Sequence, residues 1–262
     1  MTNEPKAKKS SAKKPAERVF TPAPEAKASA TQKRLFALLL WAVAIALELV
    51  AIFWVLRPPF DEMVESQGFP DSRWYMLIGF LVVIGALAIG GSFLWKKANR
   101  LDPASRAQPV RFFIQNQLGA IIAIAAFLPL IILIFKNDDM NAKQKNVAGG
   151  VGAVIAAAAV IFGIDFQPLS QEQAYVESQV VTQLVGEDRV WWAAGGDVMH
   201  LCEEVSDLQR SSDVASGTVA EAFAAGKEGI TLNVVSNLEQ CGLDIPENIE
   251  EIVEWVRSSR GR

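Results

Sequence analysis

Four apolar runs, each about as long as a membrane-crossing helix, follow one another in this chain. They are Leu35–Leu56, Trp74–Trp95, Phe112–Phe135 and Val147–Phe166. A helix needs about 20 such residues to cross the hydrocarbon core of a bilayer. The runs therefore predict an integral membrane protein in which residues 35–166 form a four-helix transmembrane bundle and the lipid bilayer is the first partner.

Charge is segregated between the two ends of the chain. Residues 1–34 contain nine Lys or Arg against three Glu, whereas the last hundred residues contain six Lys or Arg and three times as many Asp or Glu. The first 34 residues have few large apolar side chains, so we expect a disordered basic tail. An alternative role for this tail is to grip anionic lipid. The overall pattern offers no basic face for nucleic acid.

The loop charges predict the orientation of the spans. Five basic residues separate the second and third runs, while the other two loops hold two and three, mixed with acids. Basic residues collect in cytoplasmic loops, so with four spans we expect both termini in the cytoplasm of the cell. The first run follows a long polar leader and exceeds the apolar core of a cleavable signal peptide, so we expect it to be an uncleaved signal anchor. In the reducing cytoplasm Cys202 and Cys241 would be free thiols. If one run were re-entrant, the C-terminal part would face outward and the two cysteines could pair.

Glu48 is the ionisable residue deep inside a predicted span. A charge at that depth costs about 2.5–3.5 kcal/mol on insertion scales, so such a residue suggests a function by default. One interpretation is a proton or cation relay; the other is a protonated carboxyl that hydrogen-bonds to a neighbouring helix. Candidate polar partners stand at the start of the third span: Gln115, Asn116 and Gln117.

Small residues dominate the fourth span and recur in the second. They permit close approach of helix backbones. Two interpretations stay open: internal packing of the four helices, or a docking face for another membrane protein. Pro129 is expected to kink the third span. The small residues that we assign to helix packing are Ala86, Gly90, Gly149, Gly150, Gly152 and Ala156.

Residues 167–262 predict a compact, acidic α+β domain. A linking helix is expected over 170–185, a capped helix begins at Thr218 and ends near Gly226, and a terminal amphipathic helix begins at Pro246. Two short apolar stretches separated by Gly-Gly suggest a β-hairpin between them. The residues of interest in this hairpin are Trp191, Trp192, Gly195, Gly196 and His200. The fold class is thus mostly α, a four-helix transmembrane bundle with a small α+β soluble C-terminal domain.

A resemblance follows from the stretch Gly195 to Leu201, the Ser-Gly-Thr-x-x-Glu-Ala segment that begins at Ser216, and Ala225-Gly226-Lys227. It is similar to a short module at the ends of many bacterial, often actinobacterial, proteins. The module carries a Gly-x-x-Tyr-His hairpin and a metal-type set of cysteines. Here Met199 replaces the Tyr, and the Cys near Val205 and the terminal Cys-x-x-Cys pair are missing. The resemblance implies a degenerate module in a bacterial multi-pass membrane protein.

Site chemistry is sparse in the sequence. One His and two Cys are too few for the four ligands of structural zinc, although a three-ligand site of His200, Cys202 and Cys241 is conceivable. No catalytic triad, phosphate loop or dinucleotide fingerprint is present, so we predict no catalytic residue, no metal and no cofactor. We expect a non-enzymatic accessory or scaffold protein of a bacterial plasma membrane, docked to a membrane-protein partner or to a second copy. The alternative is a small transporter or membrane sensor that uses Glu48.

Overall fold

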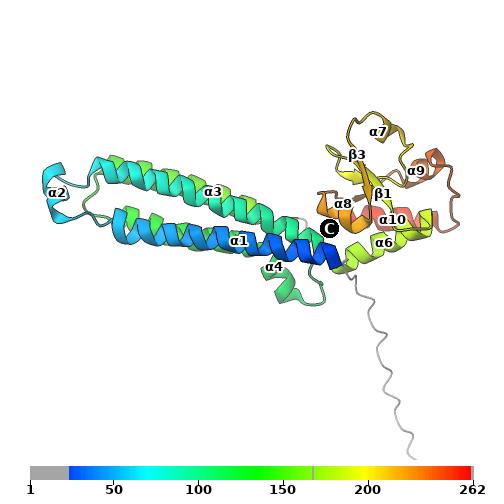
Figure 1. The fold of residues 1–262 in the computed structure, drawn as a ribbon, viewed down its shortest axis with the longest axis horizontal. Coiled ribbons are helices and arrows are strands. Elements are labelled where there is room, and N and C mark those ends of the chain that lie inside the picture. Colours follow the sequence, from blue (N-terminus) through cyan, green and yellow to red (C-terminus); the bar gives the residue numbers. More distant parts are fainter. Residues whose placement is uncertain (1–23, 167, 261–262) are drawn as a thin grey trace, which may run out of the picture.

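A computed structural model describes residues 24–166 and 168–260 of this chain. Four long helices pack side by side in its first half, with a small mixed domain at one end and a short helix, α2 (Phe60–Ser66), at the other (Figure 1). The long helices are α1 (Pro24–Val50), which continues into the π-helical segment η1 (Ala51–Val55), then α3 (Asp71–Leu101), α4 (Pro109–Lys136) and α5 (Ala142–Gly163).

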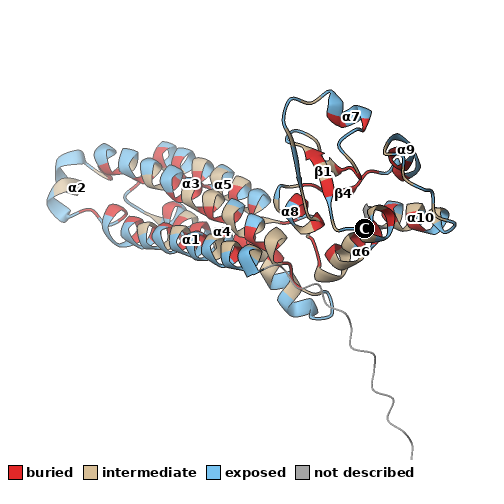
Figure 2. Cartoon of the chain, turned by 45° about the vertical axis from the view of Figure 1, so that its right-hand side comes forward, coloured by how far each residue is buried: buried red, intermediate tan, exposed pale blue. Residues whose placement is uncertain are grey.

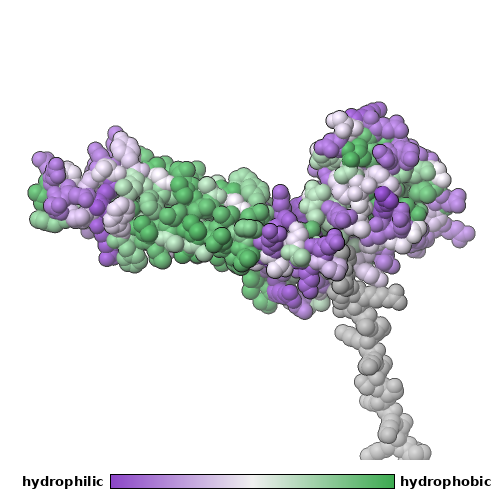
Figure 3. Space-filling model, viewed as in Figure 1, coloured by the Kyte–Doolittle hydropathy of each residue, from purple (hydrophilic) through white to green (hydrophobic). Residues whose placement is uncertain are grey.

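All four long helices have the length and hydropathy to cross a membrane, as the prediction of a membrane-embedded, multi-pass chain requires. Their outward surface forms a broad apolar zone with hydrophilic ends (Figure 3). Exposed Leu35, Phe53, Phe113 and Val154 belong to this surface. An exposed apolar surface of this extent would be unfavourable in water, whereas in a bilayer it contacts apolar lipid chains.

The interior of the four helices is a continuous apolar core. Leu77 and Leu81 of α3 and Leu130 of α4 have no exposed surface, and Trp41 of α1 is 2% exposed. The indole N–H of Trp41 donates to the carbonyl of Ala88 at 3.2 Å. Figure 2 shows the buried positions on the faces that the helices turn toward one another. Each helix therefore presents one side to its neighbours and the other outward.

The helix ends differ from the predicted spans. Helix α1 begins at Pro24, so residues 24–34, predicted as part of a disordered tail, are helical. Proline suits the first helical position because its missing N–H would be unpaired there anyway. Residues 1–23 of that predicted tail lie outside the described residues. Helix α5 ends at Gly163, three residues before the predicted end at Phe166.

The second half is a small α+β domain. Its elements are α6 (Gln171–Val185), β1 (Val190–Ala193), β2 (Val198–Met199), α7 (Ser206–Gln209), β3 (Val214–Gly217), α8 (Val219–Ala224), β4 (Gly229–Ile230), α9 (Val234–Gln240) and α10 (Ile249–Arg260). The predicted hairpin is wrong in its main pairing. Strand β1 pairs antiparallel with β3, and β2 pairs parallel with β4, while a single bridge joins Trp191 to His200.

Local signals in this domain were informative. Thr218 with Glu221 forms the predicted cap of α8, a capping box, and Ser170, within the predicted linking helix, is the N-cap of α6. The stop at Gly226 is also confirmed, since this residue has a left-handed φ of 96°. The terminal helix begins at Ile249 and not at Pro246.

The domain is joined to the four helices through the α3–α4 connection. Ser105 Oγ donates to Glu172 at 2.5 Å and the Arg106 N–H donates to the same carboxylate at 3.1 Å. The amide of Gln171 donates to the carbonyl of Ala104 at 3.2 Å. Burial opposes ionisation of Glu172, but these hydrogen bonds outweigh it, and the pKa of Glu172 lies below its usual range.

Close packing of α4 on α5 generates a prediction. A Cβ added to Gly163 would meet the backbone of Gly119 and Ala120, whereas one added to Gly150 would meet nothing within 4 Å. Gly163→Leu should therefore lower the free energy of unfolding by at least about 1–3 kcal/mol. The matched control, Gly150→Leu, should change it little. Thermal unfolding of the full chain in detergent measures both, and equal midpoints would contradict this account of the packing.

Candidate functional site

Glu48 lies in the interior of the four helices with 3% of its surface exposed. Its Oε1 has no hydrogen-bond partner among the described residues. The carboxyl group interacts with the backbone of Leu130 on α4. A buried polar atom without a partner costs about 1–3 kcal/mol, so its retention suggests a role other than stability.

Irregular backbone follows this carboxyl group on α1, and a proline precedes its neighbour Leu130 on α4. Three residues after Glu48 the chain enters η1, where the N–H of Leu56 bonds to the carbonyl of Ala51 at 2.9 Å, five residues back. Leu130 directly follows Pro129, which lies inside the continuous helix α4. Single π-helical turns occur frequently at functional sites. The combination makes Glu48 the strongest candidate for a site within the helices.

The polar residues predicted to meet Glu48 lie elsewhere. Gln115 stands fifteen residues before Leu130 on α4, which is roughly 22 Å along the helix axis. Its side chain donates to Asn99 Oδ1 and to the carbonyl of Asp102, each at 3.2 Å. Asn116 Nδ2 donates to the carbonyl of Phe112, and Gln117 donates to that of Asp165. The predicted contact between these amides and Glu48 is therefore wrong, because the amides lie near the start of α4 and Glu48 lies beside Leu130, much further along that helix.

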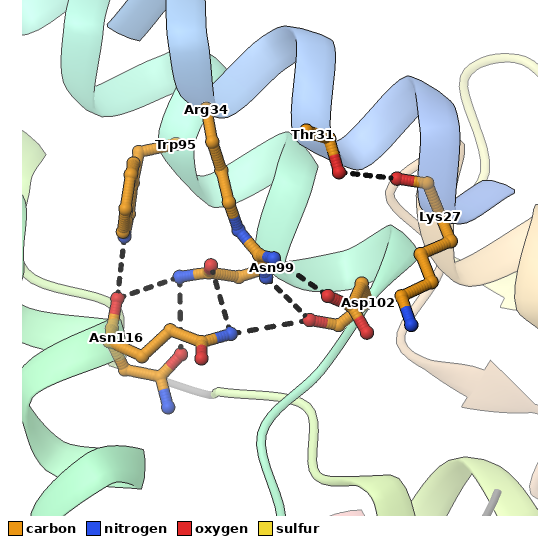
Figure 4. A network of polar contacts seen from close by, with 8 residues as sticks. Lys27, Thr31, Arg34, Trp95, Asn99, Asp102 and Asn116 are labelled. Carbon is orange, nitrogen blue, oxygen red and sulfur yellow. Dashed lines mark hydrogen bonds and ion pairs between the residues drawn. The ribbon is translucent and has the colours of Figure 1, made fainter. Parts of the chain in front are cut away.

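Gln115 and Asn116 belong to a polar network that ties three helices together near the domain (Figure 4). Arg34 of α1 donates to Asp102 Oδ2 at 2.6 Å and to the Asp102 carbonyl at 2.7 Å. Asn99 and the indole of Trp95 both donate to the carbonyl of Gln115, at 2.8 and 2.7 Å. The Arg34–Asp102 pair joins residues 68 apart in sequence, and nothing local in the sequence indicates it.

A second ion pair stands at the opposite end. Arg73 contacts both carboxylate oxygens of Glu62, at 2.5 and 2.9 Å, and donates to the carbonyl of Trp54 at 2.6 Å. The guanidinium group holds the pKa of Glu62 below its usual range. In the sequence, Arg73 is marked only by its position at the boundary of a predicted span.

The small residues of the second and fourth spans serve mainly internal contacts. Gly149 lies against Phe135, and Gly152 against Ile131 and Leu81, so both face inward. Ala156 packs at the edge of the core.

Two of the predicted packing positions point elsewhere. Gly150 and Ala86 are exposed. Gly90 lies near Leu40, but the tightest contacts of α3 occur at Gly85, against Ile155, and at Gly91, against Trp41. Each predicted position on α3 thus lies one residue from a tight contact, Ala86 after Gly85 and Gly90 before Gly91.

The predicted hairpin residues form part of the core of the small domain. Trp192 is 7% exposed and Trp191 is half-buried. His200 is buried, and its Nδ1 lies 3.2 Å from Asn237 Nδ2. Burial lowers the pKa of His200, and the carboxylate of Asp207 partly offsets this. This environment fits a structural imidazole.

Lys227 holds the turn that contains Gly195 and Gly196. Its ammonium donates to the carbonyls of Ala193 at 2.8 Å, Ala194 at 3.1 Å and Gly196. The residue is 4% exposed, so three backbone dipoles stabilise a nearly buried cation. In the sequence, Lys227 is notable only as part of the resemblance to the bacterial module.

Cys202 and Cys241 form a disulfide with a Cα–Cα distance of 5.8 Å, which corrects the expectation of free thiols. The bond joins the segment after β2 to the end of α9. The conceivable three-ligand site of His200 with both cysteines is thereby replaced by a covalent link. Among residues 24–166 and 168–260, no cluster of three or more His, Cys, Asp or Glu is arranged to hold a metal ion.

Comparison with known proteins found no matching family model, no matching curated protein and no matching solved structure. The similarity to the actinobacterial-type module therefore stays a prediction from its residues alone.

The disulfide generates a prediction for stability. It closes a 39-residue separation, for which chain entropy corresponds to about 4 kcal/mol. Cys241→Ser should therefore unfold the small domain at lower denaturant concentration. Hydrogen exchange of residues 190–241 in the full chain localises the loss. Reduced wild-type protein is the matched control and should behave like the variant; an unchanged exchange pattern after both treatments would contradict the prediction.

Proposed function

We propose that this chain is a non-enzymatic accessory or scaffold protein of a bacterial plasma membrane, a four-helix transmembrane bundle that presents an acidic docking domain. The observation that carries the proposal is an apolar groove of about 430 Å³ on the small domain, between α9 and α10. Val235, Ile249 and Val253 form its walls. The groove lies in a domain attached to the long helices through Ala104, Ser105 and Glu172, so it is held at the membrane surface.

Charge around the groove indicates the chemistry of the partner. Glu250 and Glu254 line it beside a single cation, Arg257. Exposed Leu232 and Ile245 extend apolar surface in the loops before α9 and α10. Helix-in-groove recognition uses an apolar face for affinity and complementary charge for selectivity. The fitting partner is a basic amphipathic segment of another membrane protein or of a second copy of this chain.

The fourth span contributes to docking through its outer face only. Gly149, Gly152 and Gly163 are used in contacts with α3 and α4. Gly150, Ala153 and Ala157 are exposed on the same helix and leave a smooth outward surface. A second helix can approach such a surface closely. We therefore assign the membrane part of the docking to this outer face.

We further propose that both termini face the cytoplasm. The start of α1 and the small domain lie at the same end of the four helices (Figure 1). Lys96, Lys97, Arg100, Arg106 and Arg111 stand near that end, in or beside the α3–α4 connection. Basic residues mark the cytoplasmic side. Disulfides are rare in that compartment, so on this orientation the Cys202–Cys241 pair opens in reducing conditions and closes on oxidation.

Charge reversal tests the docking groove. Glu250→Lys combined with Glu254→Lys should lower recovery of the partner about tenfold, since two rim charges of roughly 0.7 kcal/mol each are inverted. Quantitative copurification after mild detergent extraction measures the effect. Glu203→Lys with Glu204→Lys is the matched control, because both residues are exposed elsewhere on the domain. The proposal fails if wild-type protein runs as a lone monomer, or if both double variants lose the partner equally.

A second candidate function is favoured by the buried carboxyl of Glu48. A small transporter or membrane sensor would use this group to bind and release a proton or a cation. The support is the unpartnered Oε1 in a nearly inaccessible position beside η1. A site that sacrifices stability in this way is typical of functional positions.

Two substitutions separate function from structure at this position. Glu48→Leu should raise the thermal unfolding midpoint, because it removes a buried oxygen without a partner, worth about 1–3 kcal/mol. Glu48→Gln should abolish proton or cation flux in proteoliposomes while the protein stays folded. Glu65→Gln, an exposed carboxyl on α2, is the control and should leave flux intact. Equal flux in wild type and Glu48→Gln would remove this second function.

A further inference from the structure

A lateral groove of about 770 Å³ opens near the start of α4, at the end of the helices that carries the small domain. It is bounded by Arg34 of α1, Trp95 of α3 and the first turns of α4, including Arg111, Ile114 and Leu118. Its walls are contributed by three different helices, so the groove is a product of their packing. It is separate from Glu48 and from the groove between α9 and α10.

The groove has a polar mouth and an apolar interior. The positions of these residues relative to the apolar runs indicate how deep each part lies in the bilayer. Arg34 and Arg111 each directly precede an apolar run, and Trp95 ends another. All three residues therefore stand at the boundary between headgroup and hydrocarbon, where tryptophan is also enriched. Ile114 and Leu118 follow Arg111 by about one and two helical turns along α4. They line the groove at the depth of the acyl chains.

The charge at the mouth is positive. Arg34 is paired with Asp102, but a guanidinium group has five N–H donors and the two bonds to Asp102 use only part of this capacity. The Arg34 guanidinium also lies 5.9 Å from the ring centroid of Trp95, which holds it at the groove. Arg111 is exposed, and its hydrogen bond to Gln108 Oε1 is long, at 3.4 Å. The mouth thus carries two guanidinium groups, of which only that of Arg34 is paired with a carboxylate.

We propose that this groove binds one anionic phospholipid. The headgroup phosphate is held by Arg111 and by the remaining donors of Arg34, while an acyl chain lies along Ile114 and Leu118. Guanidinium groups match phosphate geometry with paired N–H donors. The net positive mouth selects an anionic headgroup over a zwitterionic one. An apolar wall that continues into the hydrocarbon layer selects a lipid over a soluble phosphate ester.

Lipid titration of the full-length protein tests the proposal. Native mass spectrometry in detergent, with phosphatidylglycerol and phosphatidylcholine as probes, should show tighter binding of the anionic lipid to wild type. Arg111→Gln should weaken phosphatidylglycerol binding about fivefold, as one lost interfacial charge would. Lys136→Gln, an exposed cation at the other end of α4, is the matched control and should have no effect.

A charge-independent variant completes the test. Ile114→Trp fills the groove from a half-exposed position and should reduce occupancy by either lipid severalfold, with an unchanged unfolding midpoint. Equal affinity of wild type for the two lipids would overturn the proposal. So would an equal loss of phosphatidylglycerol binding in Arg111→Gln and Lys136→Gln, because the arginine would then act only through general charge.

Discussion

In a hydrocarbon layer no water is available to pair with a buried donor or acceptor, and the structure of this chain depends on that constraint. Helices satisfy it for the backbone, because every internal N–H finds a carbonyl within the same segment. Side chains must satisfy it across helices. Trp41 does so with the carbonyl of Ala88. Glu48 does so incompletely, since its Oε1 has no partner among the described residues.

The distribution of polar contacts follows from the same constraint. Apart from Glu48, the ion pairs and amide networks of the long helices stand at their two ends, around Arg34 and Asp102 at one and around Arg73 and Glu62 at the other. The ends of membrane helices meet headgroups and water, where polar side chains cost least. The middle is left to apolar packing and to glycines that bring α4 and α5 together. The proposed lipid groove accordingly lies where the polar ends of the helices meet their apolar middle.

Run length predicted the four long helices, because about 20 apolar residues form a helix in lipid whatever their order. Which face each helix turns toward its neighbours was harder to predict from the sequence. Neighbouring residues on a helix differ by about 100° in direction, so Ala86 and Gly90 were plausible packing positions until the rotation of α3 placed Gly85 and Gly91 inward. Capping motifs in the small domain were readable because they are local, as at Thr218.

Contacts between distant segments carried no local signal. The disulfide joins Cys202 to Cys241 through the packing of α9, and the expectation of free thiols came from compartment alone. The pairing of β1 with β3 was likewise hidden, since the Gly-Gly step made a nearer partner look favourable. For Glu48 the sequence indicated importance but not its neighbour Leu130, which depends on the relative height of α1 and α4.

The π-helical segment η1 has one consequence for the geometry of the first connection. A turn closed over five residues takes up one residue more than a regular turn closed over four. The end of α1 and η1 thus contains one residue more than a regular α-helix of the same length. This extra residue sets the direction in which the chain leaves the helix. In this geometry the carbonyl of Trp54 accepts a hydrogen bond from Arg73. Trp54 belongs to the last turn of this segment, where carbonyl groups find no partner further along the helix, so its carbonyl remains available to the guanidinium group of Arg73.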